Sequence, residues 1–153
     1  MLRTMSGLKL ARSDLPHDVE VISDRMLVLI RGEHTDDYFA LLHSITAPGE
    51  GPPMHLHHRE DETYHILDGE YEFRVADTTI LAGRGDTVYG PRSIPHTYRN
   101  IGKHPAKMLV LLTPGGFERF FERVGELARA GITDPQSLTQ AAAQFGCDIL
   151  GPG

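Results

Sequence analysis

The chain has 153 residues, which suits one domain and leaves little room for two cores. Its 40% hydrophobic and 24% charged residues exclude a largely disordered protein, and its net charge of −6 disfavours a nucleic-acid binder, which would carry a basic face. The longest apolar run, about six residues, is far shorter than the roughly 20 that a membrane-spanning helix needs. The single cysteine, Cys147, excludes an internal disulfide and a cysteine-rich zinc site. No long apolar segment opens the chain, so we expect a cytoplasmic protein without a secretory signal.

Short apolar segments separated by turn residues fill most of the chain. Residues 1–18 are polar and mixed, and we expect them to form an arm or an edge strand. The 16 glycines and 10 prolines of the whole chain predict frequent turns, and the polar sequence Ser-Asp-Arg at 23–25 predicts a hairpin turn as well. Many short strands with closely spaced turns favour a β-sandwich or a barrel. The expected strands are 19–22, 26–31, 38–46, 55–57, 62–67, 70–75, 78–81, 86–89, 96–100 and 106–112.

Two helices are predicted near the end of the chain. Apolar residues at helical spacing form one stripe over 117–128 and a weaker one over 138–145. The sequence Thr-Asp-Pro at 133–135 is typical of a helix start, and Gly146 of a helix end. We expect both helices to cover the outer surface of the β-domain, with the barrel mouth or a partner subunit as alternatives. Cys147 lies near the end of the second helix in this interpretation, in a structural role.

Four residues have the spacing of metal ligands. His55 and His57 are two apart, so on a strand both imidazoles point to the same face. Glu62 follows after a turn, and His96 opens a later strand. Three imidazoles and one carboxylate suit one divalent transition metal per chain, from among Fe, Mn, Ni, Co, Cu and Zn. Four protein ligands leave up to two positions open on a six-coordinate ion, where a substrate or O₂ can bind.

The residues around these four resemble the two motifs of the cupin superfamily. The first motif is matched without a gap by Gly49, His55, His57, Glu62 and Gly69. Among the acidic residues at 60–62, only Glu62 keeps both of its spacings. The second motif is matched by Gly85, Pro91, His96 and Asn100, with Ser93 where the family usually has a glycine that serves a tight turn. The stretch between the motifs, 70–84, has the short length common in microbial single-domain cupins.

The resemblance implies an all-β fold, the cupin jelly-roll β-barrel, followed here by two short C-terminal α-helices. The expected organisation is an arm or edge strand at 1–18, the barrel at 19–114 and a helical extension at 115–153. Residues 52–57 and 114–118 look like those of small bacterial cupins described as quercetin-dioxygenase-like. Small cupins commonly dimerise, and apolar edge strands are costly to leave bare, so we expect a homodimer.

The function that the resemblance implies is that of a metal-dependent dioxygenase acting on a small phenolic or enolisable substrate. Glu62 is then a candidate general base for the substrate's hydroxyl proton, as well as a metal ligand. A cupin that binds a small molecule without turnover and a metal-dependent isomerase are the alternatives, because fold does not fix function. In each case we expect a small-molecule ligand, and neither nucleic acid nor a membrane as partner.

Four further residues are candidates for the substrate pocket. Tyr64 shares a strand face with Glu62, and Tyr98 shares one with His96. Phe73 is expected inside the barrel. On the strand 38–46 the face that carries His43 is the more apolar one, so His43 is expected to point into the barrel. For all four, packing in the core is the competing interpretation.

Overall fold

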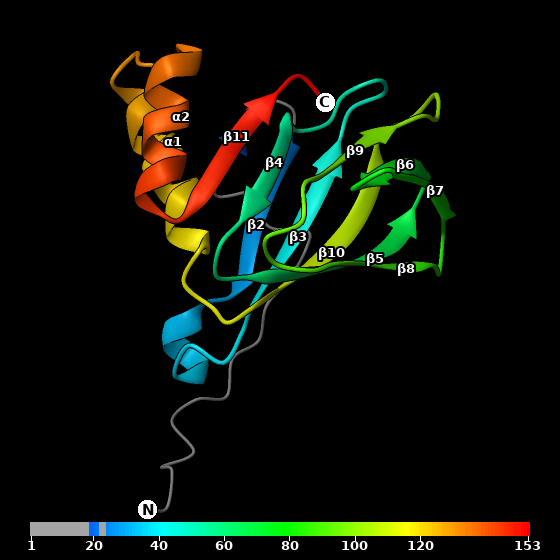
Figure 1. The fold of residues 1–153 in the computed structure, drawn as a ribbon, viewed down its shortest axis with the longest axis horizontal. Helices are drawn as coiled ribbons and strands as arrows, with labels where there is room; N and C mark the ends of the chain where they lie inside the picture. Colours follow the sequence, from blue (N-terminus) through cyan, green and yellow to red (C-terminus); the bar gives the residue numbers. More distant parts are fainter. Residues whose placement is uncertain (1–18, 22–23) are drawn as a thin grey trace, which may run out of the picture.

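The computed structural model describes residues 19–21 and 24–153, and it forms two antiparallel sheets that face each other (Figure 1). The arm or edge strand predicted for 1–18 lies outside the described residues. The six-stranded sheet has the order β1 (Val19–Val21), β2 (Asp24–Ile30), β3 (Ala40–Thr46), β10 (Ala106–Thr113), β5 (Asp61–Asp68) and β8 (Thr87–Gly90). The five-stranded sheet has the order β11 (Cys147–Gly151), β4 (Met54–His57), β9 (His96–Asn100), β6 (Glu70–Val75) and β7 (Thr78–Gly83). The predicted jelly-roll barrel is confirmed.

Alternation along the strands builds the core between the sheets. On β5, residues Glu62, Tyr64 and Ile66 are buried while their neighbours are half-exposed, as expected for a strand with one face on the core. On β6, Tyr71 and Phe73 are fully buried. Phe73 packs its ring against Tyr64 and Tyr98 from the neighbouring elements. The predicted strands agree with the structure to within a few residues at their ends.

The prediction for the inward face of β3 was wrong. The residues that point into the barrel are fully buried and are Ala40, Leu42, Ser44 and Thr46. Thr46 accepts a hydrogen bond from the Tyr71 hydroxyl of the facing sheet. His43 is buried too, but it lies on the opposite face of the strand. The comparison of hydropathy between the two faces gave the wrong result because both faces of β3 carry buried residues. The inward face includes two hydroxyl residues, Ser44 and Thr46.

The last strand, β11, was not predicted. Cys147 belongs to this strand and not to the end of a helix, which corrects the earlier interpretation. β11 pairs with β4, placing Cys147 opposite His57 and Ile149 opposite His55. The chain therefore returns from the helices to the barrel and supports the strand that carries two of the histidines.

The two predicted helices are present, and they lie between β10 and β11. They are α1 (Glu118–Arg129) and α2 (Pro135–Gln144). The Asp134 side chain caps α2 by accepting a hydrogen bond from the Ser137 N–H, and Gly146 ends this segment with a φ of 73°. A short 3₁₀ helix, η1 (Gly32–Thr35), joins β2 to β3. None of the described helices has the length and apolar character needed to cross a bilayer.

The start of α1 is tied to η1 by a buried carboxylate. Glu118 is 1% exposed, and its two oxygens accept hydrogen bonds of 2.6 Å from the backbone N–H groups of Gly32 and Gly116. Both donors would otherwise lack partners in the interior, which is costly. Gly32 leaves no room for a side chain, because a Cβ there would meet Asp37 and Glu118.

We predict that Glu118→Ala lowers the free energy of unfolding by about 1–3 kcal/mol, because it leaves the backbone N–H groups of Gly32 and Gly116 without hydrogen-bond partners. Glu126→Ala, an exposed position on the same helix, is the control and is expected to cost no more than about 0.5 kcal/mol. Denaturant unfolding of both variants measures the difference. Equal effects for the two variants would contradict the assigned role of Glu118.

Candidate metal centre

Three strands bring the four predicted ligands together inside the barrel. His55 and His57 come from β4, Glu62 from β5 and His96 from β9. His55 and His96 are opposite each other in the β4–β9 pair, and all four side chains are buried. One potential ligand atom from each residue lies within 4.8 Å of the other three. The i, i+2 spacing and the antiparallel register therefore produce one compact cluster.

Glu62 Oε2 is the point on which the three imidazoles converge. Its distances to the Nε2 atoms are 2.7 Å for His96, 3.1 Å for His57 and 3.7 Å for His55. The Tyr64 hydroxyl donates a hydrogen bond of 2.6 Å to the same oxygen. The carboxylate comes from the six-stranded sheet and thus sits among nitrogen atoms that all come from the five-stranded sheet.

Backbone carbonyls fix the orientation of two of the rings. His55 Nδ1 lies 2.8 Å from the Pro53 carbonyl oxygen, and His96 Nδ1 lies 2.9 Å from that of Ile94. Because a carbonyl can only accept, each Nδ1 carries the hydrogen and donates it. In the neutral ring, Nε2 is then left with a lone pair that points toward Glu62. This is the tautomer in which histidine binds a metal through Nε2.

The cluster fits a bound cation. Lone pairs on imidazole nitrogens and on a carboxylate oxygen repel each other at these separations unless a proton or a metal ion lies between them. Both ring nitrogens of His57 are buried without a hydrogen-bond partner in the described part of the chain. Buried polar atoms are normally satisfied, so the unpaired Nε2, which lies 3.1 Å from Glu62 Oε2, indicates a missing partner in the cluster. His55, His57, Glu62 and His96 would hold the ion.

The electrostatics of the cluster favour positive charge, whether a proton or a metal ion carries it. Burial lowers the pKa of His57, but the carboxylates of Glu62 and Glu60 outweigh it and raise the pKa to about 9. Burial acts to raise the pKa of Glu62, but the surrounding imidazoles outweigh it and hold the pKa well below its usual range. Burial lowers the pKa of His55, which favours the neutral ligand form. Burial and the Glu62 charge hold the pKa of Tyr64 well above its usual value, so its hydroxyl stays a donor.

Glu60 lies next to the cluster, although its position does not fit the spacing of the first motif. It is 2% exposed, and its Oε2 lies 3.7 Å from His57 Nδ1, with no hydrogen-bond partner among the described residues. A carboxylate behind a ligand histidine orients the ring and raises its basicity. The only signal in the sequence was the acidic run at 60–62, which says nothing about burial.

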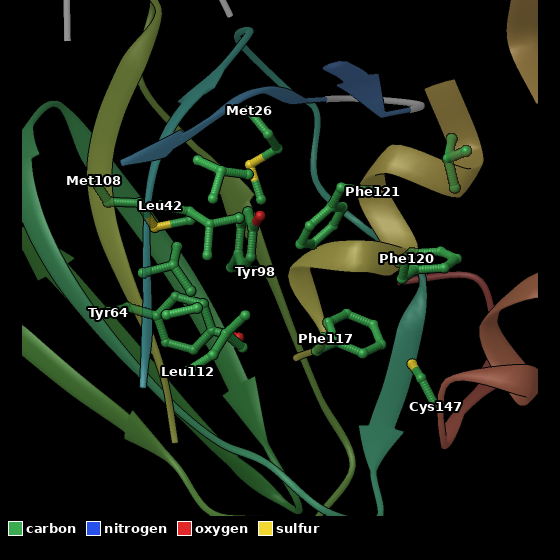
Figure 2. Close-up of a cluster of buried hydrophobic side chains, with 14 of the residues drawn as sticks. Met26, Leu42, Tyr64, Tyr98, Met108, Leu112, Phe117, Phe120, Phe121 and Cys147 are labelled. Carbon is green, nitrogen blue, oxygen red and sulfur yellow. The ribbon is translucent and has the colours of Figure 1, made fainter. Parts of the chain in front are cut away.

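The cluster opens into a cavity of about 910 Å³. Three phenylalanines of the α1 segment, Phe117, Phe120 and Phe121, form one wall, and Figure 2 shows them across from Tyr64 and Tyr98. Phe117 meets the His57 ring edge-on, with centroids 4.3 Å apart. Thr133, Pro135, Leu138 and Thr139 of the α2 segment contribute to the lining as well. The helices therefore face the barrel mouth, which corrects the expectation that they cover its outer surface.

Of the four predicted pocket residues, the structure brings two to the cavity and leaves the other two away from it. Tyr64 and Tyr98 line the cavity, whereas Phe73 lies in the core behind them. His43 is not among the lining residues of the described chain. Ser93 has a φ of 62°, so it adopts the left-handed turn that the family's glycine would favour, and its N–H donates to the His57 carbonyl.

Comparison with known proteins shows where this barrel belongs. The Cupin domain family model matches residues 42–112, which contain both motifs. A predicted oxalate decarboxylase from Thermotoga maritima has a similar structure, with a TM-score of 0.64 at 23% identity over 69% of this chain and 98% of that one. KdgF from Halomonas sp. has a TM-score of 0.59 at 14% identity over 67% and 91%. The chain belongs to the cupin superfamily.

Two curated relatives have higher sequence identity. This cupin is 31% identical to quercetin 2,3-dioxygenase of Bacillus subtilis over 108 residues, which is 69% of this chain and 32% of that enzyme. It is 32% identical over 75 residues to an uncharacterized protein of Methanocaldococcus jannaschii, which is 49% of this chain and 60% of that protein. The cupin chain thus spans about a third of the length of the first relative and under two thirds of the second.

We predict that the purified cupin carries about one transition metal per chain and that the double variant His55→Ala, His57→Ala loses it, since two of four ligands are gone. The matched control replaces two histidines outside the cluster, His58 and His65, with alanine and is expected to keep the metal. Elemental analysis measures both. Stoichiometric metal in the first variant would contradict the site.

Glu60→Gln is predicted to weaken metal affinity by about 10–100-fold, because His57 loses the carboxylate behind Nδ1. Asp61→Asn is the control, since Asp61 pairs with Arg92 and not with a histidine. Competition with a chelator gives both affinities. An unchanged affinity in Glu60→Gln would show that Glu60 does not act on His57.

Proposed function

We propose that this cupin is a metal-dependent dioxygenase of a small phenolic or enolisable substrate. The observation that carries the proposal is that the four-residue cluster opens into a cavity walled by phenyl rings. A flat aromatic molecule suits such a wall, because its faces can pack against Phe117 and Phe121 while one end reaches the cluster. Its relative in Bacillus subtilis is named as a dioxygenase of quercetin, a flavonol.

The protein's own residues would bind and orient such a substrate. A divalent metal would supply Lewis-acid and, if redox-active, O₂ chemistry at its open positions. The apolar wall would exclude water from the cluster, which strengthens its electrostatic interactions. Tyr64, which donates to Glu62 Oε2, would hold that carboxylate in one orientation.

We further propose Glu62 as the group that accepts the substrate's hydroxyl proton. It is the carboxylate of the cluster, and it lines the cavity together with His55 and His57. A hydroxyl held at the metal would lie within reach of one of its oxygens, which is the geometric requirement for a general base.

Oxygen consumption tests the proposal directly. Protein loaded separately with Fe, Mn and Ni is given flavonols and other enolisable phenols, and O₂ uptake is recorded with the His55→Ala, His57→Ala variant as the control. Uptake that depends on metal and substrate is the expected result. Tight binding of a co-purified small molecule with no uptake for any metal would favour a non-catalytic binding cupin instead.

Glu62→Gln is predicted to slow turnover by about 10²–10⁴-fold at saturating metal, because the proton acceptor is lost while three imidazoles and an amide oxygen remain as ligands. Turnover is measured with metal in excess, after metal content has been checked. Turnover near that of the wild type under these conditions would leave Glu62 as a metal ligand only.

We also propose that the protein is a homodimer. Strands β7 and β8 are edge strands of the two sheets, and they carry Leu81 and Tyr89, which are 69% and 56% exposed. Exposed apolar side chains on strand edges favour pairing with another chain. Light scattering at micromolar concentration is predicted to give twice the 17.0 kDa of one chain, and Leu81→Lys to lower it. A wild-type mass of one chain would contradict the dimer.

A further inference from the structure

A second polar group lies in the same cavity and takes no part in the metal cluster. Asp24, the first residue of β2, is 6% exposed and lines the cavity. Its Oδ2 accepts a hydrogen bond from the Tyr98 hydroxyl. Its Oδ1 has no hydrogen-bond partner among the residues that the structure describes, and neither has the buried Ser44 hydroxyl. Asp24 faces Thr46, and Ser44 faces Met26, across the β2–β3 pair.

An unpaired carboxyl oxygen in the interior needs an explanation. Buried polar atoms that have lost water and gained no partner destabilise a fold, so native proteins rarely leave them without a purpose. Burial raises the pKa of Asp24, and the hydroxyls of Tyr98, Thr46 and Ser44 offset this only in part, while the Glu50 charge adds to it. The groups around Asp24 are thus hydroxyls and another carboxylate, which disfavours an anionic ligand.

The tyrosine pair connects this second polar group to the metal cluster. The Tyr64 hydroxyl is bonded to Glu62, and the Tyr98 hydroxyl is bonded to Asp24. Their rings meet edge-on, with centroids 5.6 Å apart. Both side chains are labelled in Figure 2. Apolar side chains of Met26, Val110 and Phe121 also line the cavity. One cavity therefore has two polar ends with an aromatic and apolar middle.

We propose that Asp24 and Tyr98 form a subsite that binds a hydroxyl group of the substrate at the end remote from the metal. A hydroxyl fits because it can donate to Asp24 Oδ1, the carboxyl oxygen that has no hydrogen-bond partner among the described residues. The apolar middle requires that the body of the ligand be flat and carbon-rich. The ligand class is therefore a polyhydroxylated aromatic, and in naming it the inference rests on the function proposed above.

Binding of two flavonols to the zinc-loaded protein tests the subsite without turnover, because zinc is redox-inert. Quercetin carries hydroxyls remote from its metal-binding end, whereas 3-hydroxyflavone carries only the hydroxyl at that end and serves as the internal reference. The wild type is expected to bind quercetin at least about tenfold more tightly, a ratio typical of one buried hydrogen bond. Asp24→Leu is expected to bring the ratio close to one and to leave 3-hydroxyflavone affinity nearly unchanged.

Two further variants keep the test decisive if Asp24→Leu folds poorly. Asp24→Asn preserves the side-chain shape, and Tyr98→Phe removes only the hydroxyl that is bonded to Asp24; each is expected to reduce the ratio by about threefold or more. Asp77→Leu, an exposed position, is the control and should keep the wild-type ratio. An unchanged ratio in the Asp24 and Tyr98 variants, an equal loss for both flavonols, or no binding of either flavonol would overturn the subsite.

Oxygen uptake by the redox-active metal forms separates this inference from the proposed activity. Quercetin that binds with the expected ratio but consumes no O₂ would support the subsite and reject the dioxygenase. Quercetin that is oxidised at the same relative rate by the wild type and Asp24→Leu, with an unchanged binding ratio, would reject the subsite and support the dioxygenase.

Discussion

Glu62 Oε2 lies among the Nε2 atoms of three histidines in a buried site, and neutral rings alone leave that arrangement repulsive. A cation between them turns four mutually repelling atoms into four ligands. Groups around the cluster hold the four side chains in this arrangement. Two carbonyls set the ring tautomers of His55 and His96, and the Tyr64 hydroxyl holds the carboxylate from a third direction. Metal binding and folding are expected to be coupled for this reason.

The barrel supplies this geometry by register and not by local propensity. His55 faces His96 only because β4 and β9 pair antiparallel at that position, and β5 reaches the cluster from the other sheet. The Ser93 turn before β9 keeps a left-handed backbone and bonds to the His57 carbonyl, so the two motif segments are joined directly. A slip of one residue in either strand would turn a ligand out of the barrel.

The sequence predicted the features that depend on fixed spacing. Strand alternation and the two motifs were enough for the fold and for the ligand set that the structure brings together. Features that depend on tertiary contacts were missed. The face of β3 was misassigned because its inward side carries Ser44 and Thr46, and the Thr46 hydroxyl has a polar partner, the Tyr71 hydroxyl, inside the barrel. Asp24 was placed in a turn, since nothing local indicates that Tyr98, 74 residues away, covers it.

The C-terminal segment shows that the site is not a property of the barrel alone. α1 supplies the phenylalanine wall beside His57, and β11 supports β4 by pairing with the strand that carries His55 and His57. The cluster determines which chemistry a bound metal can offer, whereas the phenylalanine wall and the tyrosine pair determine the shape of the cavity beside it. A barrel with the same four ligands and a different C-terminal segment would keep the metal chemistry but would have a cavity of a different shape. The wall of the cavity beside the cluster is therefore formed in part by residues that lie outside both motif segments.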